Sequence, residues 1–199
     1  MVRERQMTLI AGVDEAGRGP LAGPVLAAAV ILDPSKPIEG LTDSKLLTEK
    51  ARQRLYHEIK AKALAYHVSQ ATVEEIEGIN ILQASLLAMK RAVEGLTITP
   101  DEIWVDGTYV PKVSMPGKAI IEGDLLHANI SAASILAKVD RDEIMVEYAK
   151  IHPEYGFEKH KGYPTKDHLL AIKAHGVLPI HRKTYGPVKK HLEQLEHHE

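Results

Sequence analysis

The sequence predicts an α/β fold in which helices pack on the faces of a mixed β-sheet. The chain has 199 residues, of which 44% are hydrophobic, and this suits one domain with a substantial core. Short apolar runs cluster near the start of the chain, at residues 9–13 and 25–32. Helical periodicities then alternate with further short apolar runs, and this order is typical of helices covering a sheet.

The first 71 residues contain three predicted strands and one predicted helix. Residues 9–13 and 25–32 are separated by a turn rich in glycine and proline, so we expect two adjacent buried strands. A helix is predicted to begin near Thr48, because apolar residues follow at helical spacing. A third strand is predicted over residues 66–71.

The rest of the chain continues this alternation. Asn80 is a predicted N-cap of a helix that ends near Gly95. Short strands are then predicted over residues 102–106 and 119–121, and a long helix over residues 129–150. We expect residues 1–150 to form the core and residues 151–199 to form a helical extension, the two together making one compact unit.

The segment from 150 to 191 is predominantly basic, although the whole chain has a formal net charge of −2. Its basic residues are Lys150, Lys159, Lys161, Lys166, Lys173, Arg182, Lys183, Lys189 and Lys190. A basic face on an otherwise acidic protein is suited to following a phosphate backbone. A solvated helical surface explains this composition equally well.

Two compositional features limit the possible chemistry and location. The chain lacks cysteine, so a metal would be held by oxygen or imidazole ligands, which favours a hard cation such as Mg²⁺. A zinc site is not expected, because the histidines lack paired metal-ligand spacing.

The polar opening over residues 1–7 and the lack of an 18-residue apolar run predict a cytoplasmic protein without a membrane partner.

Carboxylates occur where predicted strands end, at Asp14 and Glu15, at Asp106 and at Asp124. Gathered like charges repel, so such a cluster is best explained by divalent cations that neutralise it. Two cations about 4 Å apart can activate water and stabilise the leaving oxygen of a phosphodiester. Taken singly, Asp106 or Asp124 is also compatible with an ordinary turn or capping residue.

Asp14 and Glu15 are neighbours, and neighbours in a regular strand point to opposite faces of the sheet. We therefore expect the backbone to leave the strand at these residues. The glycines at 17 and 19 support a sharp turn there, because glycine tolerates positive φ and permits close approach of another molecule.

The run from residue 14 to residue 20 resembles the signature opening of the ribonuclease HII family, also called type 2 ribonuclease H. Further matching segments follow in the family's order, at residues 43–45, 105–107, 123–124, 131–139, 160–165 and 181–182. The resemblance covers residues 9 to about 188. One departure is Thr184-Tyr185, where the family usually has Ser-Phe.

The resemblance implies a ribonuclease H-like fold, a mixed β-sheet flanked by helices, with extra C-terminal helices. It implies that four residues are catalytic carboxylates that hold two Mg²⁺ or Mn²⁺ ions when substrate is bound. These are Asp14, Glu15, Asp106 and Asp124.

The resemblance also implies how substrate is recognised. Main-chain groups of Gly17, Arg18 and Gly19 would read the ribose 2′-hydroxyl, which distinguishes RNA from DNA. Tyr163 would pack on the sugar beyond the junction. Further candidates, for phosphate contacts or for support of the site, are Lys45, Lys138 and Arg182.

The activity implied is that of an endonuclease acting 5′ to ribonucleotides in RNA/DNA hybrids and in DNA duplexes with embedded ribonucleotides. Its products would carry 3′-hydroxyl and 5′-phosphate ends, and its role would be to remove misincorporated ribonucleotides from DNA. We expect a monomer.

Three alternatives remain at this stage. Ribonuclease HIII shares similar motifs but carries an added N-terminal domain, whereas only thirteen residues precede Asp14 here. A Mg²⁺-dependent phosphohydrolase of small esters would also use carboxylates at strand ends, without needing the basic segment or Tyr163. A non-catalytic nucleic-acid-binding protein would not need all four carboxylates.

Overall fold

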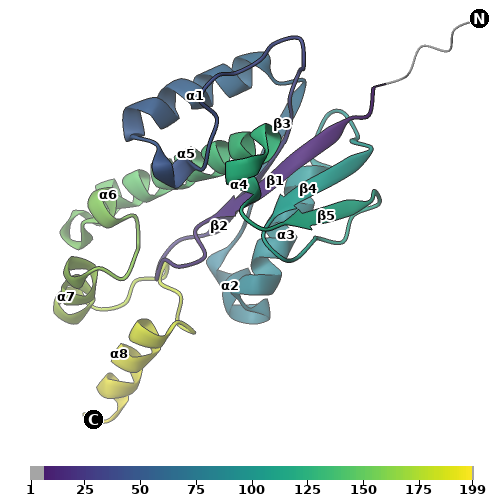
Figure 1. The fold of residues 1–199 in the computed structure, drawn as a ribbon. Helices are drawn as coiled ribbons and strands as arrows, with labels where there is room; N and C mark the ends of the chain where they lie inside the picture. Colours follow the sequence, from purple (N-terminus) through teal and green to yellow (C-terminus); the bar gives the residue numbers. More distant parts are fainter. Residues whose placement is uncertain (1–6, 199) are drawn as a thin grey trace, which may run out of the picture.

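A computed structural model describes residues 7–198, which form a five-stranded sheet covered by helices (Figure 1). The strand order is β3-β2-β1-β4-β5. The strands are β1 (Ile10–Ala16), β2 (Val25–Ile31), β3 (Ala65–Ala71), β4 (Glu102–Asp106) and β5 (Gly117–Ile120). β1, β2 and β3 pair antiparallel, whereas β4 pairs parallel with both β1 and β5, so the predicted mixed sheet is confirmed.

Strand β2 lies inside the sheet, and all seven of its residues are buried. Because side chains alternate between faces, Ala27 and Ala29 belong to one hydrophobic cluster, whereas Ala28 and Val30 belong to another. Small alanines leave room for helices on both sides of the sheet. Its continuous apolar pattern is therefore that of a strand covered on both faces.

Helices cover both faces, as Figure 1 shows. α3 (Ile81–Glu94) packs with the cluster that contains Ala27, and α1 (Glu49–Lys62) and α5 (Ala128–Ile151) pack with the cluster that contains Ala28. None of the helices formed by residues 7–198 combines the length and apolarity needed to cross a membrane.

The predicted N-terminal ends of two helices, at Thr48 and at Asn80, are confirmed. The Thr48 side chain accepts a hydrogen bond from the amide of Ala51, and the Asn80 side chain accepts one from the amide of Gln83. Each satisfies an amide that the first helical turn leaves unpaired. Helix α2 (Val73–Ile79) was not predicted.

Helix α5 begins directly against β1, and Gly12 is the reason. A Cβ atom at Gly12 would lie 2.2 Å from the carbonyl carbon of Asn129, which is far closer than atoms can approach. The missing side chain therefore lets the first turn of α5 lie on the strand that carries Asp14.

The C-terminal segment packs on the loop that follows β1. It contains η2 (Pro153–Tyr155), α6 (Phe157–His160), α7 (Lys166–His175) and α8 (Gly186–Glu196). An isolated β-bridge joins Ala22 to His181, and the amide of Gly23 donates to the carbonyl of Ile180 at 2.9 Å. The C-terminal segment, although distant in sequence, thus holds the loop after β1 in place.

Two expectations about the strand ends are wrong. β1 continues through Asp14 and Glu15, because both keep antiparallel partners on β2 after the pairing with β4 has ended at Val13. The backbone turns at Gly17 instead. Asp124 does not end a strand but lies four residues beyond β5, in the first turn of the short helix α4 (Gly123–Leu126).

Candidate active site

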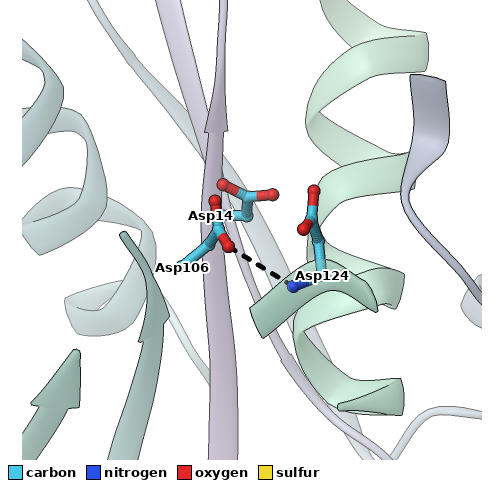
Figure 2. Close-up of side chains that lie close together, drawn as sticks. All are labelled: Asp14, Asp106 and Asp124. Atoms are coloured by element: carbon cyan, nitrogen blue, oxygen red, sulfur yellow. Dashed lines mark hydrogen bonds between the residues drawn. The ribbon is translucent and has the colours of Figure 1, made fainter. Parts of the chain in front are cut away.

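Three aspartates meet at one edge of the sheet, and each comes from a different element (Figure 2). Asp14 lies on β1, Asp106 is the last residue of β4, and Asp124 lies in the first turn of α4. Each offers a carboxylate oxygen, and these oxygens lie within 4.8 Å of one another. The amide of Asp124 also donates to Oδ1 of Asp106 at 3.4 Å. Parallel pairing of β1 with β4 places the first two side chains together.

The triad is electrostatically unfavourable without a bound cation. Burial raises the pKa of Asp14 well above its ordinary value, and the negative charges of Glu15 and Asp106 add to the effect. Burial, followed by the charge of Asp106, raises the pKa of Asp124 to about 6. Three hard oxygen donors under mutual repulsion match the ligand preference of a divalent cation such as Mg²⁺ or Mn²⁺.

Glu15 lies outside this group of three. Its side chain lines the same cavity, of about 300 Å³, and its amide donates to Oδ1 of Asp14 at 2.8 Å. Burial raises the pKa of Glu15, whereas the Arg18 guanidinium lowers it. Of the four predicted carboxylates, the structure therefore brings three together and places the fourth on the cavity wall.

The cavity also collects most of the predicted substrate-binding residues. Those that line it are Gly17, Arg18, Gly19, Lys45, Lys138 and Tyr163. These residues come from the turn after β1, the segment before α1, helix α5 and the loop before α7. Basic side chains and the aromatic ring of Tyr163 thus lie around the carboxylates.

The two glycines of the loop have different surroundings. Gly17 is buried at φ +97°, and a Cβ atom there would lie 2.1 Å from Nε of Arg141. Gly19 is exposed, and a Cβ atom there would lie 3.4 Å from the Tyr163 ring. Gly17 is required by the fold, whereas Gly19 keeps the space beside Tyr163 open.

Arg182 is fully buried, so the prediction that it contacts phosphate directly is wrong. Its guanidinium donates to the carbonyls of Gly17 at 2.7 Å, Pro20 at 2.9 Å, Gly23 at 2.9 Å and Arg18 at 3.1 Å. These bonds turn the carbonyls of the loop inward. Arg182 therefore supports the site, which was the other role considered for it.

The departure at Tyr185 has a structural counterpart. The Tyr185 hydroxyl accepts from Nη1 of Arg182 at 3.0 Å and donates to the carbonyl of Arg18 at 2.5 Å. A phenylalanine would make neither bond. The tyrosine therefore adds a link between the buried guanidinium and the exposed loop.

A second buried guanidinium, that of Arg141 on α5, was not recognised in the sequence. It donates to the carbonyls of Ala22 at 2.8 Å, Lys161 at 2.9 Å and Pro24 at 3.2 Å. Burial, followed by the charge of Arg182, lowers the pKa of Arg141 to about 10, so it stays charged at neutral pH. It ties the loop after β1 to the segment that carries Tyr163.

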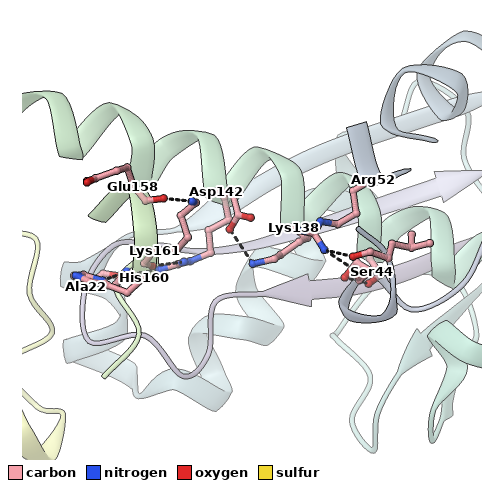
Figure 3. A network of polar contacts seen from close by, with 12 residues as sticks. Ala22, Ser44, Arg52, Lys138, Asp142, Glu158, His160 and Lys161 are labelled. Atoms are coloured by element: carbon pink, nitrogen blue, oxygen red, sulfur yellow. Dashed lines mark hydrogen bonds and ion pairs between the residues drawn. The ribbon is translucent and has the colours of Figure 1, made fainter. Parts of the chain in front are cut away.

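The two predicted lysines differ in their contacts. Lys138 pairs with Asp142 at 2.9 Å along α5 (Figure 3), and its Nζ lies 6.0 Å from the centroid of the Tyr163 ring. Lys45 is exposed, and its amide is held by the side chain of Asp43. Lys45 therefore extends from a fixed backbone.

Buried serines on α5 also support the site, and sequence reasoning missed them. Ser131 donates to the carbonyl of Asp124 at 2.5 Å, which fixes the turn that carries this carboxylate. Ser134 bonds to Ser44 at 2.9 Å beside Lys45. Both serines lie in the 131–139 segment that resembles the family, but neither the resemblance nor their helical spacing indicated these bonds.

Carboxylates gathered at one edge of a mixed sheet, beside a cavity lined with basic side chains, form the arrangement typical of hydrolases that use divalent cations. A model of the family described as Ribonuclease HII matches residues 11–188 of this sequence. The chain belongs to the ribonuclease HII family, whose members are endoribonucleases.

Relatives support this assignment over nearly the whole chain. Ribonuclease HII of Marinomonas sp. (strain MWYL1) is 61% identical over 186 residues, which cover 93% of this chain and 94% of the relative. Ribonuclease HII of Chromobacterium violaceum is 62% identical over 181 residues, covering 90% and 91%.

Solved structures share the fold. The ribonuclease H2 of Pyrococcus horikoshii OT3 superposes with a TM-score of 0.79 at 30% identity, covering 95% of this chain and 99% of that protein. Bst ribonuclease HIII, solved in complex with Mn²⁺, gives a TM-score of 0.74 at 18% identity. The superposition covers 96% of this chain but only 71% of the HIII protein. The ribonuclease H-like fold is thereby confirmed.

Proposed function

We propose that this enzyme hydrolyses the phosphodiester bond 5′ to a ribonucleotide, in RNA/DNA hybrids and in DNA duplexes with embedded ribonucleotides. The products would carry 3′-hydroxyl and 5′-phosphate ends. The observation that supports this proposal best is the shared cavity, in which the aspartate triad lies beside Gly17, Gly19 and Tyr163.

The triad of Asp14, Asp106 and Asp124 would hold Mg²⁺ or Mn²⁺, and we propose two cations when substrate is bound. Bound there, the cations would supply an activated water and charge stabilisation for the leaving oxygen. Glu15, on the cavity wall, would act as the fourth catalytic carboxylate. The oxygen donors fit these hard cations, and the raised pKa values of Asp14 and Asp124, caused by burial and mutual repulsion, support the proposal of a positive partner.

Recognition of the ribose would depend on backbone rather than on long side chains. Arg182 engages the carbonyl of Gly17, and the exposed residues Arg18 and Gly19 lie at the cavity mouth. Main-chain groups of this loop would bond the 2′-hydroxyl, which is both donor and acceptor. The half-exposed ring of Tyr163 would lie against the following sugar.

Phosphate contacts would come from two places. Lys45 and Lys138 line the cavity and would contact the backbone near the cleaved bond. We further propose that residues 151–199 contribute to duplex binding as part of the same compact unit as residues 1–150. Such contacts fix the register of a duplex without reading its bases.

We propose that the enzyme acts as a monomer in the bacterial cytoplasm, where it would remove ribonucleotides misincorporated into DNA. A single ribonucleotide followed by deoxyribose satisfies both the loop and Tyr163, so one ribonucleotide should be sufficient. This distinguishes the proposal from general degradation of RNA.

The test is cleavage of an end-labelled DNA duplex that contains one ribonucleotide, with and without Mg²⁺. We expect a single cut on the 5′ side of the ribonucleotide that requires the cation. Failure to cut this duplex while a continuous RNA/DNA hybrid is cleaved would refute the proposed substrate. Turnover of free nucleotides alone would favour a phosphohydrolase, and duplex binding without cleavage would favour a non-catalytic protein.

A further inference from the structure

Three buried histidines lie behind the cavity and have no part in the function proposed above. His160, His168 and His181 are 9%, 0% and 0% exposed. The rings of His160 and His168 stack with centroids 4.3 Å apart and planes 10° from parallel. Both rings contact the Phe157 ring in the core of the C-terminal segment.

The backbone partners of His181 and His168 determine where each neutral ring carries its proton. The amide of Leu178 donates to Nδ1 of His181 at 2.8 Å, so the proton of His181 lies on Nε2. That Nε2 lies 2.9 Å from Nε2 of His168, which must therefore accept. The proton of His168 is left on Nδ1, from where it is donated to the carbonyl of Tyr163 at 2.9 Å.

His160 is fixed in the same manner from the other side. The amide of Gly162 donates to its Nδ1 at 3.0 Å, so Nε2 carries the proton and donates to the carbonyl of Tyr155 at 2.6 Å. The carbonyl of His160 in turn accepts from the amide of Tyr163 at 2.9 Å. Both main-chain groups of Tyr163 thus bond to these histidines.

The segment before Tyr163 needs such restraint. Lys161 has φ +53° and Gly162 has φ +91°, so two consecutive residues adopt the left-handed conformation. For Lys161 this conformation costs about 1 kcal/mol or more relative to a right-handed one. Tyr163 as a residue is 37% exposed, whereas its carbonyl and amide are bonded to the buried residues His168 and His160.

Burial keeps the network neutral. It lowers the pKa of His168 to about 4 and that of His181 to about 3, with neighbouring histidines adding to the effect in both cases. At neutral pH each ring therefore retains one donor and one acceptor, as the bonding pattern requires.

We infer that His168, held in one tautomer by His181, is a positioning residue that orients Tyr163 and thereby sets the preference of the enzyme for a single ribonucleotide. This inference rests on the proposed role of Tyr163 at the sugar. His168 touches no substrate and acts only through the Tyr163 backbone. A residue that merely filled the core would affect stability and both substrates alike.

The tautomers provide a test that does not depend on activity. Long-range ¹H–¹⁵N NMR of the ring nitrogens should show His168 protonated on Nδ1 and His181 protonated on Nε2. A His168 ring protonated on Nε2 would overturn the inference, because it could not donate to Tyr163.

Two substitutions of His168 form a matched pair. Both His168→Leu and His168→Asn leave the Nε2 proton of His181 without its acceptor, so their cost in stability should be similar. Only asparagine retains a donor near the position of Nδ1. We expect His168→Leu to lower the ratio of single-ribonucleotide cleavage to hybrid cleavage by about tenfold, because small misplacements reduce rates strongly. His168→Asn should restore most of this ratio.

Comparison with Tyr163→Ala separates the inference from the proposed function. In the Tyr163→Ala background, His168→Leu should cause no further fall in the ratio. If Tyr163→Ala lowers the ratio and His168→Leu does not, or if the two effects multiply, the positioning role is refuted. If Tyr163→Ala itself leaves the ratio unchanged, the proposed role of Tyr163 fails and the inference fails with it. His175→Leu, an exposed histidine near the same cluster, should behave as the wild type.

Discussion

Arg182 donates a hydrogen bond of 2.7 Å to the carbonyl of Gly17, a residue 165 positions earlier in the chain. Three further carbonyls of the same loop bond to this one guanidinium. Its partners in the described part of the chain are carbonyl and hydroxyl oxygens rather than carboxylates. A charge commonly used to bind phosphate is used here to shape a loop.

Replacing Arg182 by methionine should destabilise the protein by about 3 kcal/mol or more, because several buried carbonyls would lose a charged donor at once. Arg182→Lys keeps the charge but cannot reach all these carbonyls from one nitrogen, so it should restore only part of the stability. Urea unfolding measures both. Tyr185→Phe, which removes only the hydroxyl link, should cost about 1 kcal/mol. Equal stability of Arg182→Met and wild type would contradict the supporting role.

Asp106→Asn and Asp124→Asn should each reduce the cleavage rate by at least about 10²-fold while preserving the fold. Each substitution keeps the shape of the side chain but removes a charge that a cation needs. The measurement is single-turnover cleavage with Mg²⁺, accompanied by circular dichroism. Near-normal turnover by Asp106→Asn would remove it from the cation site.

The stability of the metal-free protein should fall as pH rises through about 6. The pKa of Asp124 in the folded state is about 6, above the ordinary 3.8, so the folded state holds this proton more tightly than the unfolded state. The resulting stabilisation is complete below pH 3.8 and lost as pH rises through the folded value. Urea unfolding in a chelator at several pH values measures the slope. Asp124→Asn should show a shallower slope, and added Mg²⁺ should stabilise the wild type most at high pH. An unchanged slope in Asp124→Asn would refute this assignment.

Gly17→Ala and Gly19→Ala should separate folding from recognition. At Gly17 the new methyl group would collide with Arg141 in a left-handed conformation, so we expect a marked loss of stability. At Gly19 the methyl group would make an ordinary contact with Tyr163, so stability should change by less than about 0.5 kcal/mol while cleavage falls. Thermal unfolding measures the stability of both variants, and cleavage assays measure their activity. A Gly17→Ala protein as stable as the wild type would be unexpected.

The basic C-terminal segment should make the affinity for a duplex depend on salt concentration. Lys161→Gln should weaken binding of all duplex sequences alike and reduce the salt slope by about 1, if Lys161 neutralises a phosphate. Lys183 lies 3.9 Å from Glu77, so Lys183→Gln should have a smaller effect. Fluorescence anisotropy over a range of salt concentrations gives both slopes. Unchanged slopes in both variants would count against this surface.

Much of the fold could be predicted because local signals determine it. The buried strand β2 is an unbroken apolar run, and Thr48 and Asn80 cap helices by bonds to amides three residues ahead. Helix α2 was missed although Thr72 and Glu75 form a capping box, because its seven residues offer too little periodicity. The end of β1 was misjudged because pairing with β2, a property of the partner strand, extends it to Ala16.

The site could be predicted where the residue type itself determines the chemistry. Aspartates that meet across parallel strands are such a case, and the triad confirms the expected convergence of Asp14, Asp106 and Asp124. The supporting residues could not be predicted. A buried arginine that bonds carbonyls looks in sequence like any surface arginine, and the bonds of Arg182 join segments whose proximity no local pattern reveals.

The bridge between Ala22 and His181 joins a segment that the ribosome makes early to one that it makes late. When the first 150 residues have been synthesised, the residues of all five strands and the three aspartates are present, but the donor that bonds the carbonyls of the loop after β1 is not. Those carbonyls find their donor only when Arg182 has been synthesised. The growing chain therefore contains the three aspartates before it contains the arginine that fixes the loop beside them. Discrimination between sugars would be the last property to mature.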